Sequence, residues 1–267
     1  MPKIASWNIN SVRLRIDLVL DFLGQAQPDI LCLQETKTED EFFPRAILAE
    51  KGYIHQHICG QKSYNGVAII SKIPFEEVDL PQGDFLQDNK TRLQAVRLEN
   101  GIILRNFYIP AGGDIADEVL NDKFAHKMNL LRHLHKTFYA QPTTAEIIVG
   151  DFNIAPHEHD VWSHKQLLKV VSHTPQEVEL LNQLKKSADF IDIFRDTAPH
   201  PATDKIYSWW SYRGKDWQKS NRGRRLDHIW CSRDLSAMIG DKQIYQDYRG
   251  KDRPSDHVPI MVQIHKG

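Results

Sequence analysis

The sequence predicts an α/β fold in which mixed β-sheets are covered by helices. Apolar runs typical of strands alternate with helical patterns from one end of the chain to the other. Two of these runs, Ile30–Leu33 and Ile147–Val149, are apolar throughout, as in strands that are buried on both faces. The turn Glu99–Gly101 between two further strand patterns indicates a hairpin, so antiparallel pairs are also present. Sheets packed inside helices satisfy all three observations.

Eight segments have the composition of strands, and three have the apolar spacing of helices. The strands, in chain order, are Lys3–Asn8, Asp29–Gln34, Gly66–Ser71, Leu93–Leu98, Ile102–Tyr108, Glu146–Gly150, Leu226–Ser232 and Val258–Ile264. The helices are Arg13–Gln25, Asp117–Tyr139 and Pro175–Ser187. The last helix has the clearest start, because Thr174 suits the N-cap, Pro175 the first helical position, and Glu177 completes a capping box.

Length and composition favour one globular domain that spans residues 1–267. A hydrophobic content of 41% allows a large core without disulfide bonds, and no linker or repeat divides the chain. No apolar run reaches the roughly 18 residues of a membrane span, and no signal-peptide pattern is present. Cys32, Cys59 and Cys231 are odd in number and match no zinc motif. We therefore expect a reduced, cytoplasmic, monomeric protein with no membrane partner.

The net charge of -1 does not by itself indicate a nucleic-acid-binding protein, but one segment is strongly basic. Between residues 213 and 225 a single acid, Asp216, accompanies six basic residues: Arg213, Lys215, Lys219, Arg222, Arg224 and Arg225. Such a segment can hold phosphates while the rest of the surface stays neutral. A solvated surface loop explains the same pattern, and charge alone does not separate the two interpretations.

Polar residues recur where the predicted strands end or begin. They are Asn8, Glu35, Tyr108, Asp151, Asn153, Asp227, His228, Asp256 and His257. Taken singly, each has a simpler explanation as a turn residue, a cap or a core aromatic. Together they offer hard oxygen ligands of the kind that magnesium prefers, and groups that can transfer protons. Phosphodiester hydrolysis needs a cation, a group that activates water, and donors around the phosphate.

Eight motifs in order along the chain give the sequence a specific resemblance. They are Ser6-Trp7-Asn8, Leu33-Gln34-Glu35-Thr36-Lys37, Gly66-Val67-Ala68-Ile69, Tyr108-Ile109-Pro110, Gly150-Asp151-Phe152-Asn153, Tyr207-Ser208-Trp209-Trp210, Arg225-Leu226-Asp227-His228 and Ser255-Asp256-His257. With these motifs the chain resembles the exonuclease III family of AP endonucleases, a branch of the exonuclease–endonuclease–phosphatase superfamily. The resemblance implies a DNase I-like four-layer α/β sandwich with two packed mixed sheets. It also implies hydrolysis of DNA on the 5′ side of abasic sites, with 3′-phosphodiesterase and 3′→5′ exonuclease activity on duplex DNA.

The same resemblance implies roles for the polar residues. Glu35 corresponds to the main metal carboxylate, with Asn8 close by, and Asp256 lies near the metal. Asp151 corresponds to the residue that orients or deprotonates the attacking water, and Asn153 positions it. His257 contacts the scissile phosphate while Asp227 holds its imidazole, and Tyr108 lies against the phosphate or the leaving oxygen. The implied cofactor is Mg²⁺, with Mn²⁺ as a substitute, and its ligand set is Asn8, Glu35, Asp151, Asn153, Asp256 and His257.

The implied partner is double-stranded DNA with abasic sites or blocked 3′ ends. Arg13 and Arg92 correspond to contacts with backbone phosphates. Trp209, Arg224 and Leu226 belong to the segment that lines the abasic pocket, whereas we expect Trp210 to pack in the core. A missing base lowers the cost of flipping a nucleotide out of the helix, which would select damaged DNA.

Three positions depart from the family pattern and bear on substrate preference. Ala111 stands where many relatives carry Asn or Gln, although the backbone of Gly112 and Gly113 can offer N–H donors instead. Arg224 occupies a pocket position that is aromatic in some relatives. Asn10 stands where some relatives have Asp, which weakens the case for a second metal ion.

Two other classes of function fit parts of the sequence. A phosphatase, sphingomyelinase or secreted nuclease of the same fold would act on another phosphodiester or a phosphomonoester. The basic, tryptophan-rich segment 207–226 favours DNA over these substrates. A DNA-binding module without catalysis would not need both Asp151 and His257. A metal-binding interpretation of His157-Glu158-His159 is weaker than that of a charged loop.

Overall fold

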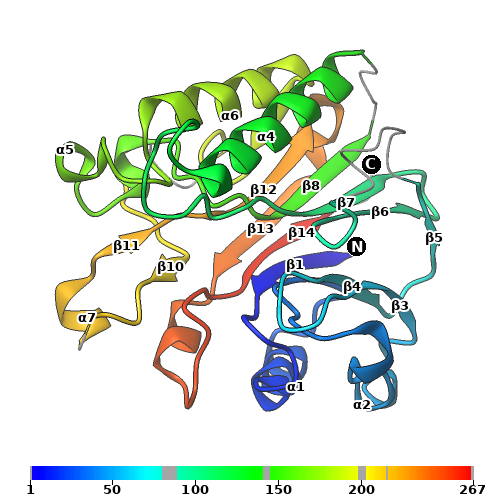
Figure 1. The fold of residues 1–267 in the computed structure, drawn as a ribbon. Coiled ribbons are helices and arrows are strands. Elements are labelled where there is room, and N and C mark those ends of the chain that lie inside the picture. Colours follow the sequence, from blue (N-terminus) through cyan, green and yellow to red (C-terminus); the bar gives the residue numbers. More distant parts are fainter. Residues whose placement is uncertain (1, 80–88, 141–144, 198–202, 215, 266–267) are drawn as a thin grey trace.

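The computed structural model describes residues 2–79, 89–140, 145–197, 203–214 and 216–265. Within them, the strands form two six-stranded mixed sheets and a separate two-stranded ribbon. The first sheet has the strand order β13-β14-β1-β2-β4-β3, and the second has the order β5-β6-β7-β8-β12-β9. The sheets pack face to face with helices outside each of them, so the expected four-layer α/β sandwich is confirmed (Figure 1).

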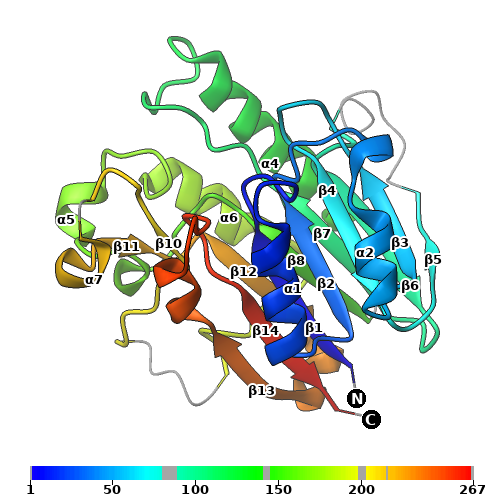
Figure 2. The ribbon, with the colours of Figure 1, turned by 90° about the horizontal axis from the view of Figure 1, so that it is seen from below.

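The first sheet is covered on its outer face by two helices. Its strands are β1 (Lys3–Asn8), β2 (Ile30–Gln34), β3 (His55–Cys59), β4 (Val67–Ser71), β13 (Ile239–Ile244) and β14 (Ile260–Ile264). Helices α1 (Ile16–Gln25) and α2 (Arg45–Glu50) lie across it (Figure 2). Trp7 and Leu31 point to this side, where they pack with Phe22 of α1.

The second sheet is covered by two longer helices. Its strands are β5 (Phe75–Glu77), β6 (Leu93–Leu98), β7 (Ile103–Tyr108), β8 (Glu146–Asp151), β9 (Phe190–Asp192) and β12 (Asp227–Ser232). Helices α4 (Asp122–Ala140) and α6 (Pro175–Ser187) pack on it through Phe124, Leu131 and Leu181. The capping box that the sequence predicts at Thr174 and Glu177 is formed.

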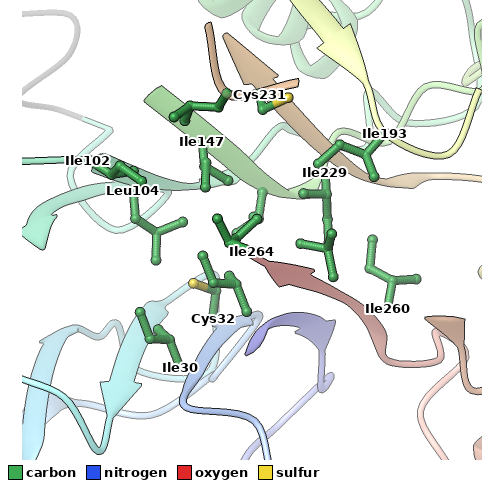
Figure 3. Packing of buried hydrophobic residues seen from close by; sticks show 14 of the residues in the cluster. Ile30, Cys32, Ile102, Leu104, Ile147, Ile193, Ile229, Cys231, Ile260 and Ile264 are labelled. Carbon is green, nitrogen blue, oxygen red and sulfur yellow. The ribbon is translucent and has the colours of Figure 1, made fainter. Parts of the chain in front are cut away.

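The main core lies between the two sheets (Figure 3). Ile30 and Cys32 of β2 face Leu104, Ile147 and Ile229 of the second sheet across this layer. Because successive strand residues point to opposite faces, the alternate residues of β2 face the helices instead. A strand with apolar contacts on both faces explains why its sequence is a continuous apolar run.

A smaller group of elements lies at one side of the sandwich, at the left of Figure 1. It contains the ribbon of β10 (Trp209–Trp210) and β11 (Gly223–Arg224), with the short helices α5 (His164–Leu167) and α7 (Trp217–Ser220). Four 3₁₀ helices complete the elements of the described residues: Asp40–Phe42, Glu158–Asp160, Arg233–Met238 and Gln246–Gly250. No described helix combines the length and apolarity needed to cross a bilayer.

The predicted strands match the observed ones closely, apart from the last, whereas two predicted helices begin too early. β14 begins at Ile260 rather than Val258, and α1 begins at Ile16 rather than Arg13. Helix α4 begins at Asp122 rather than Asp117 because the Asp117 carboxylate accepts bonds from the backbone N–H groups of Val119 and Leu120, which forms a turn.

Candidate active site

Strand pairing brings the polar strand ends together on one rim of the sandwich. In the first sheet, β1 runs parallel to β2, so that Asn8 ends beside the start of the Glu35 segment. In the second sheet, β7 runs parallel to β8 with Tyr108 opposite Asp151, and antiparallel β12 places Asp227 on the other side of Asp151. The predicted convergence of these side chains is therefore observed.

Gly150 allows β7 and β8 to approach closely just before the rim. Its φ is 140°, and a Cβ at this position would lie 1.9 Å from the carbonyl oxygen of Phe107. Any side chain here would push β7 away from β8 and separate Tyr108 from Asp151. The close approach of β7 and β8 thus explains why the Gly150-Asp151-Phe152-Asn153 motif begins with a glycine.

The Asp151 carboxylate lies at the centre of the site and is completely buried. Its Oδ2 accepts hydrogen bonds from Asn8 Nδ2 at 2.8 Å and from Asn153 Nδ2 at 3.0 Å, and its Oδ1 accepts one from the Asn153 backbone N–H at 2.8 Å. His257 Nε2 lies 3.6 Å from Oδ2. We refer to Asn8, Asp151, Asn153, Asp227 and His257 as the catalytic cluster.

The amide of Asn8 joins two carboxylates. Its Nδ2 donates to Glu35 Oε1 at 2.9 Å as well as to Asp151, while its Oδ1 accepts from the Asn10 backbone N–H at 3.1 Å. The side-chain oxygen of Asn8 is therefore directed away from Glu35. In this arrangement Asn8 orients the two carboxylates as a hydrogen-bond donor.

His257 and Asp227 form a buried ion pair, with Nδ1 and Oδ2 separated by 2.8 Å. Burial alone would lower the pKa of His257, but Asp227 and Asp151 outweigh it and raise the pKa to about 10. The imidazole is thus a cation at neutral pH. Ser208 Oγ fixes the start of β12 by accepting hydrogen bonds from the backbone N–H groups of Leu226 and Asp227; this contact was not predicted from the sequence.

The Asp151 carboxylate is shielded from solvent, and this changes its pKa. Burial raises its pKa to about 7, with Asp227 and Glu35 adding to the rise and His257 and Asn8 opposing it. A carboxyl whose pKa lies near the working pH can accept a proton and release it again. The paired asparagines hold it in one orientation while it does so.

Tyr108 closes the other side of the site. Its ring lies under the Arg92 guanidinium, 4.8 Å from the ring centroid. Burial, together with the charges of Glu35 and Asp151, raises the pKa of its hydroxyl well above the ordinary value, so it stays protonated and can donate a hydrogen bond. Arg92, Tyr108, Glu35 and His126 line a cavity of about 640 Å³. Arg13 is exposed, and its guanidinium lies 5.8 Å from the centroid of Phe42.

Oxygen ligands suited to a hard dication are present at Glu35. Its carboxylate faces the cavity, where water and a substrate phosphate can complete a coordination sphere. Lys37 Nζ lies 2.7 Å from Glu35 Oε2 and 2.6 Å from Asn10 Oδ1. Asn10 Nδ2 in turn donates to Asp256 Oδ1 at 3.1 Å, which places Asp256 on the same side of the site.

A second group of ligand atoms lies deeper. Among the residues that the structure describes, Asp151, Asp227 and His257 offer atoms within 4.8 Å of one another. The ion pair uses His257 Nδ1 and Asp227 Oδ2, and a protonated imidazole cannot bind a metal ion; within the described residues, Asp227 Oδ1 is left without a hydrogen-bond partner. Glu35 is also paired, with Lys37, but it lines the open cavity, where water and phosphate can complete a coordination sphere, so a cation fits better there. The predicted metal roles of Asn8, Asp151, Asn153 and His257 stay predictions.

A buried lysine that was not predicted from the sequence supports the loop after β8 that carries Asn153, which we call the catalytic loop. Lys127 Nζ donates to the backbone oxygen of Asn153 at 2.9 Å and pairs with Glu177, whose carboxylate also accepts the backbone N–H of Ser172. Both side chains of the pair are fully buried. The signal was present, because Lys127 lies on the apolar face of α4, three residues after Phe124.

The basic segment 213–225 divides into exposed and buried parts. Arg213, Lys219 and Arg222 are exposed, and Lys215 lies outside the described residues. Arg225 is buried between Asp160 and Asp192 and donates to both of them. Arg225 therefore fits neither interpretation of the segment, because its charge is already neutralised inside the protein.

The predicted pocket residues occupy different positions. Trp209 Nε1 donates to Asp256 Oδ2 at 2.9 Å, and its backbone pairs with His257. The Arg224 guanidinium lies 5.2 Å from the centroid of the Trp209 ring and donates to Ser172 Oγ at 2.7 Å. Leu226 is buried and packs against Trp209, so we expect it to support Trp209 rather than touch DNA. Trp210 is 1% exposed, and its expected core packing is confirmed.

Trp209 and Arg224 also border a cavity of about 780 Å³. Its remaining walls come from the loop after β7, from the α5 region and from the ribbon. We call it the tryptophan pocket; its lining residues are Gly113, Asp114, Trp162, Val170, Val171, Trp209, Trp210, Ser211, Arg213, Gly214, Trp217, Ser220, Arg222 and Arg224.

Comparison with known proteins matches this chain to one family over nearly its whole length. The model of the Endonuclease/Exonuclease/phosphatase family matches residues 5–257. Exodeoxyribonuclease III of Haemophilus influenzae is 32% identical over 279 aligned positions, which cover 98% of this chain and 99% of the relative. DNA repair nuclease APEX1 of Danio rerio is 29% identical, with 97% and 81% of the two chains covered.

Two solved structures have the same arrangement of elements. An AP endonuclease from Archaeoglobus fulgidus has a TM-score of 0.89 and 30% identity, with 99% of each chain covered. A 3′ phosphatase from Neisseria, bound to a product DNA hairpin, has a TM-score of 0.90 and 30% identity, with 100% of each chain covered. The motifs that form the rim described above thus lie within a fold that these proteins share.

Proposed function

Because the chain belongs to the endonuclease/exonuclease/phosphatase family, we propose that it is a DNA-repair nuclease that cuts DNA 5′ to abasic sites. The proposal includes 3′-phosphodiesterase and 3′→5′ exonuclease activity on duplex DNA, carried out by a cytoplasmic monomer of one domain. The observation that carries it is the buried Asp151 between two asparagine donors and 3.6 Å from a positively charged His257. This set combines a proton acceptor with a cation that can face a phosphate.

In the proposed reaction Asp151 accepts a proton from the attacking water, since its raised pKa suits a general base. Asn8 and Asn153 hold its carboxylate in place by donating to Oδ2. His257, kept charged by Asp227, offsets negative charge on the phosphate. Tyr108, which stays protonated, donates to the phosphate or to the leaving oxygen.

We propose Mg²⁺ as the cofactor, held at Glu35 with Asp256 nearby; Mn²⁺ would substitute for it. When bound, the ion would supply charge neutralisation at the scissile phosphate. The ligands available at Glu35 are oxygens, which suits magnesium better than a softer metal. Phosphates of the DNA backbone would lie along Arg92, which lines the same cavity as Glu35, and along the exposed Arg13.

One duplex with and without a central abasic analogue tests the proposal. With Mg²⁺ we expect a single incision on the 5′ side of the analogue, and gradual digestion from a recessed 3′ end of the intact duplex. EDTA should stop both reactions and added Mg²⁺ should restore them. Full activity in EDTA would remove the metal from the mechanism, and no incision at the analogue would refute the endonuclease proposal.

A second candidate is removal of a phosphate from a 3′ DNA end, which is a phosphomonoesterase reaction. The observation that favours it is the similarity over the full length to the Neisseria 3′ phosphatase. A duplex that carries a 3′-phosphate, assayed for released inorganic phosphate beside the abasic duplex, measures the ratio of the two activities. Rapid phosphate release without incision would assign the chain to this second function.

A further inference from the structure

The tryptophan pocket is larger and more aromatic than a sugar without a base requires. Its volume of about 780 Å³ lies within the range of pockets that enclose a whole organic ligand. Four tryptophans line it; Trp210 packs in the core, whereas Trp162, Trp209 and Trp217 are partly exposed. We propose that this pocket is a binding subsite for an unpaired nucleotide that still carries its base.

The stacking surface is Trp162, which lines the pocket and is partly exposed. The Arg222 guanidinium lies over its ring, 4.7 Å from the centroid. Trp162 is tied to the ribbon, because its backbone N–H donates to Gly223 O at 3.1 Å. Proteins bind unpaired strands by stacking bases on aromatic rings, with arginines adding cation–π contacts. The Trp162–Arg222 stack is a surface of this type.

The charge of the pocket suits the phosphate of such a nucleotide. Arg213, Arg222 and Arg224 line it against one carboxylate, that of Asp114. Arg224 is held by Ser172 and Val171, whereas the guanidinium groups of Arg213 and Arg222 enter no ion pair within the described ranges. Both of these groups are exposed, so a phosphate can reach them from solvent.

The pocket is also placed so that a strand can enter it from the catalytic cluster. Trp209 is shared between the two, because it donates to Asp256, pairs with His257 and borders the pocket. A nucleotide flipped out next to the scissile phosphate would therefore enter the pocket beside Trp209. This inference rests on the proposed function, since it assigns a further ligand to the same DNA-binding rim.

Fluorescence of 2-aminopurine tests the proposal, because stacking on an aromatic ring quenches it. Three duplexes would be titrated with protein in EDTA: one with 2-aminopurine in a single-nucleotide bulge, one with it in an unpaired 3′ end, and one with it base-paired. We expect quenching on binding for an unpaired base and none for the paired one. The bulge and the 3′ end show which kind of unpaired nucleotide enters. Equal signals from paired and unpaired duplexes would overturn the proposal.

Variants of the stack make the test specific. Arg222→Ala should weaken binding of the unpaired 2-aminopurine duplex about tenfold, at least fivefold more than binding of the abasic duplex. Trp162→Leu should remove the quenching, with Trp162→Phe retaining part of it. Arg97→Ala removes an exposed arginine near the C-terminal end of β6 and should change neither the binding nor the quenching.

Equal losses on both duplexes in Arg222→Ala would make Arg222 a general phosphate contact and overturn the subsite. Circular dichroism of Trp162→Leu reports whether the fold is intact, and the exposed Arg222 provides the test if it is not. The proposed function fails separately, if the wild-type protein does not cut the abasic duplex in Mg²⁺. In that case the quenching assay still reports on the pocket, because it needs no cleavage.

Discussion

The catalytic cluster and the tryptophan pocket meet at Trp209, yet their side chains are held in different ways. Asp151 and Asp227 extend from paired strands and are buried; Asp151 accepts three hydrogen bonds, and the Asp227 carboxylate pairs with His257. Arg213 and Arg222 extend from the ribbon segment, which lies outside both six-stranded sheets, and are exposed. This difference indicates that the reacting groups and the DNA-selecting groups lie on separate parts of the rim. Rigid strands fix the groups that react, and a more open segment presents the groups that select a strand.

Removing the carboxylate at the centre of the catalytic cluster should distinguish cleavage from DNA binding most clearly. We expect Asp151→Asn to lower single-turnover cleavage of the abasic duplex about 100- to 10,000-fold, the usual contribution of a general base. Binding of the same duplex, measured in EDTA by fluorescence anisotropy, should change little because Trp209 and Arg92 remain. Cleavage within a few-fold of the wild type would exclude Asp151 as the base.

Lys127 tests how far the catalytic loop depends on buried charge. Lys127→Met leaves Glu177 buried without its partner, so the free energy of unfolding should fall by about 3–5 kcal/mol. Urea denaturation followed by circular dichroism measures it. Lys136→Met is the matched control, since Lys136 is exposed on the same helix and its loss should be nearly neutral. Equal losses of unfolding free energy in the two variants would show that the Lys127–Glu177 pair does not stabilise the protein.

The charge on His257 should depend on its partner. Asp227→Asn removes the main interaction that raises the pKa of His257, so this pKa should fall from about 10 toward 6.5. NMR titration of the metal-free protein measures it. A raised folded pKa stabilises the wild type fully below the unfolded pKa, and this stabilisation disappears as the pH rises through 10. In Asp227→Asn the loss should occur at lower pH; an unchanged His257 titration would contradict the pairing.

The smallest effects should come from single phosphate contacts. Binding of intact duplex should weaken steeply with salt, and Arg92→Ala or Arg13→Ala should each reduce the slope of log K against log salt by about 1. Arg97→Ala at the opposite end of β6 should leave the slope unchanged. Equal slopes for wild type, Arg92→Ala and Arg13→Ala would show that these two residues lie away from the DNA backbone.

How well the sequence predicted the molecule depended on whether local pattern or distant contacts decided each feature. The strands β1 and β6 and the helix α6 were predicted to the residue, because apolar period and a capping box determine them. Short elements such as α2 and β3 were missed, since neither has enough residues for a clear periodic pattern. Short strands such as β3 are fixed by their pairing with neighbouring strands, and a local sequence pattern holds no information about that pairing.

The site shows the same division. Asp151, Asp227 and His257 were identified from motifs at strand ends, and the structure brings them together. Lys127 and Arg225 were not recognised as buried, because charged residues are usually exposed and their partners lie far away in sequence. Arg225 even belongs to a segment whose other basic residues are mostly exposed. Only the position of Asp160 and Asp192 in the fold distinguishes it from them.

Neither sheet of the sandwich contains a complete reaction centre. Asn8 comes from the first sheet and Asp151 from the second, and they meet at 2.8 Å only when the two layers are packed together. His257, just before β14, depends in the same way on Asp227 of β12. A nascent or partly unfolded copy therefore lacks the means to cut. For a nuclease, this architecture links strand breakage to an intact fold, because the cluster forms only when both sheets are packed together.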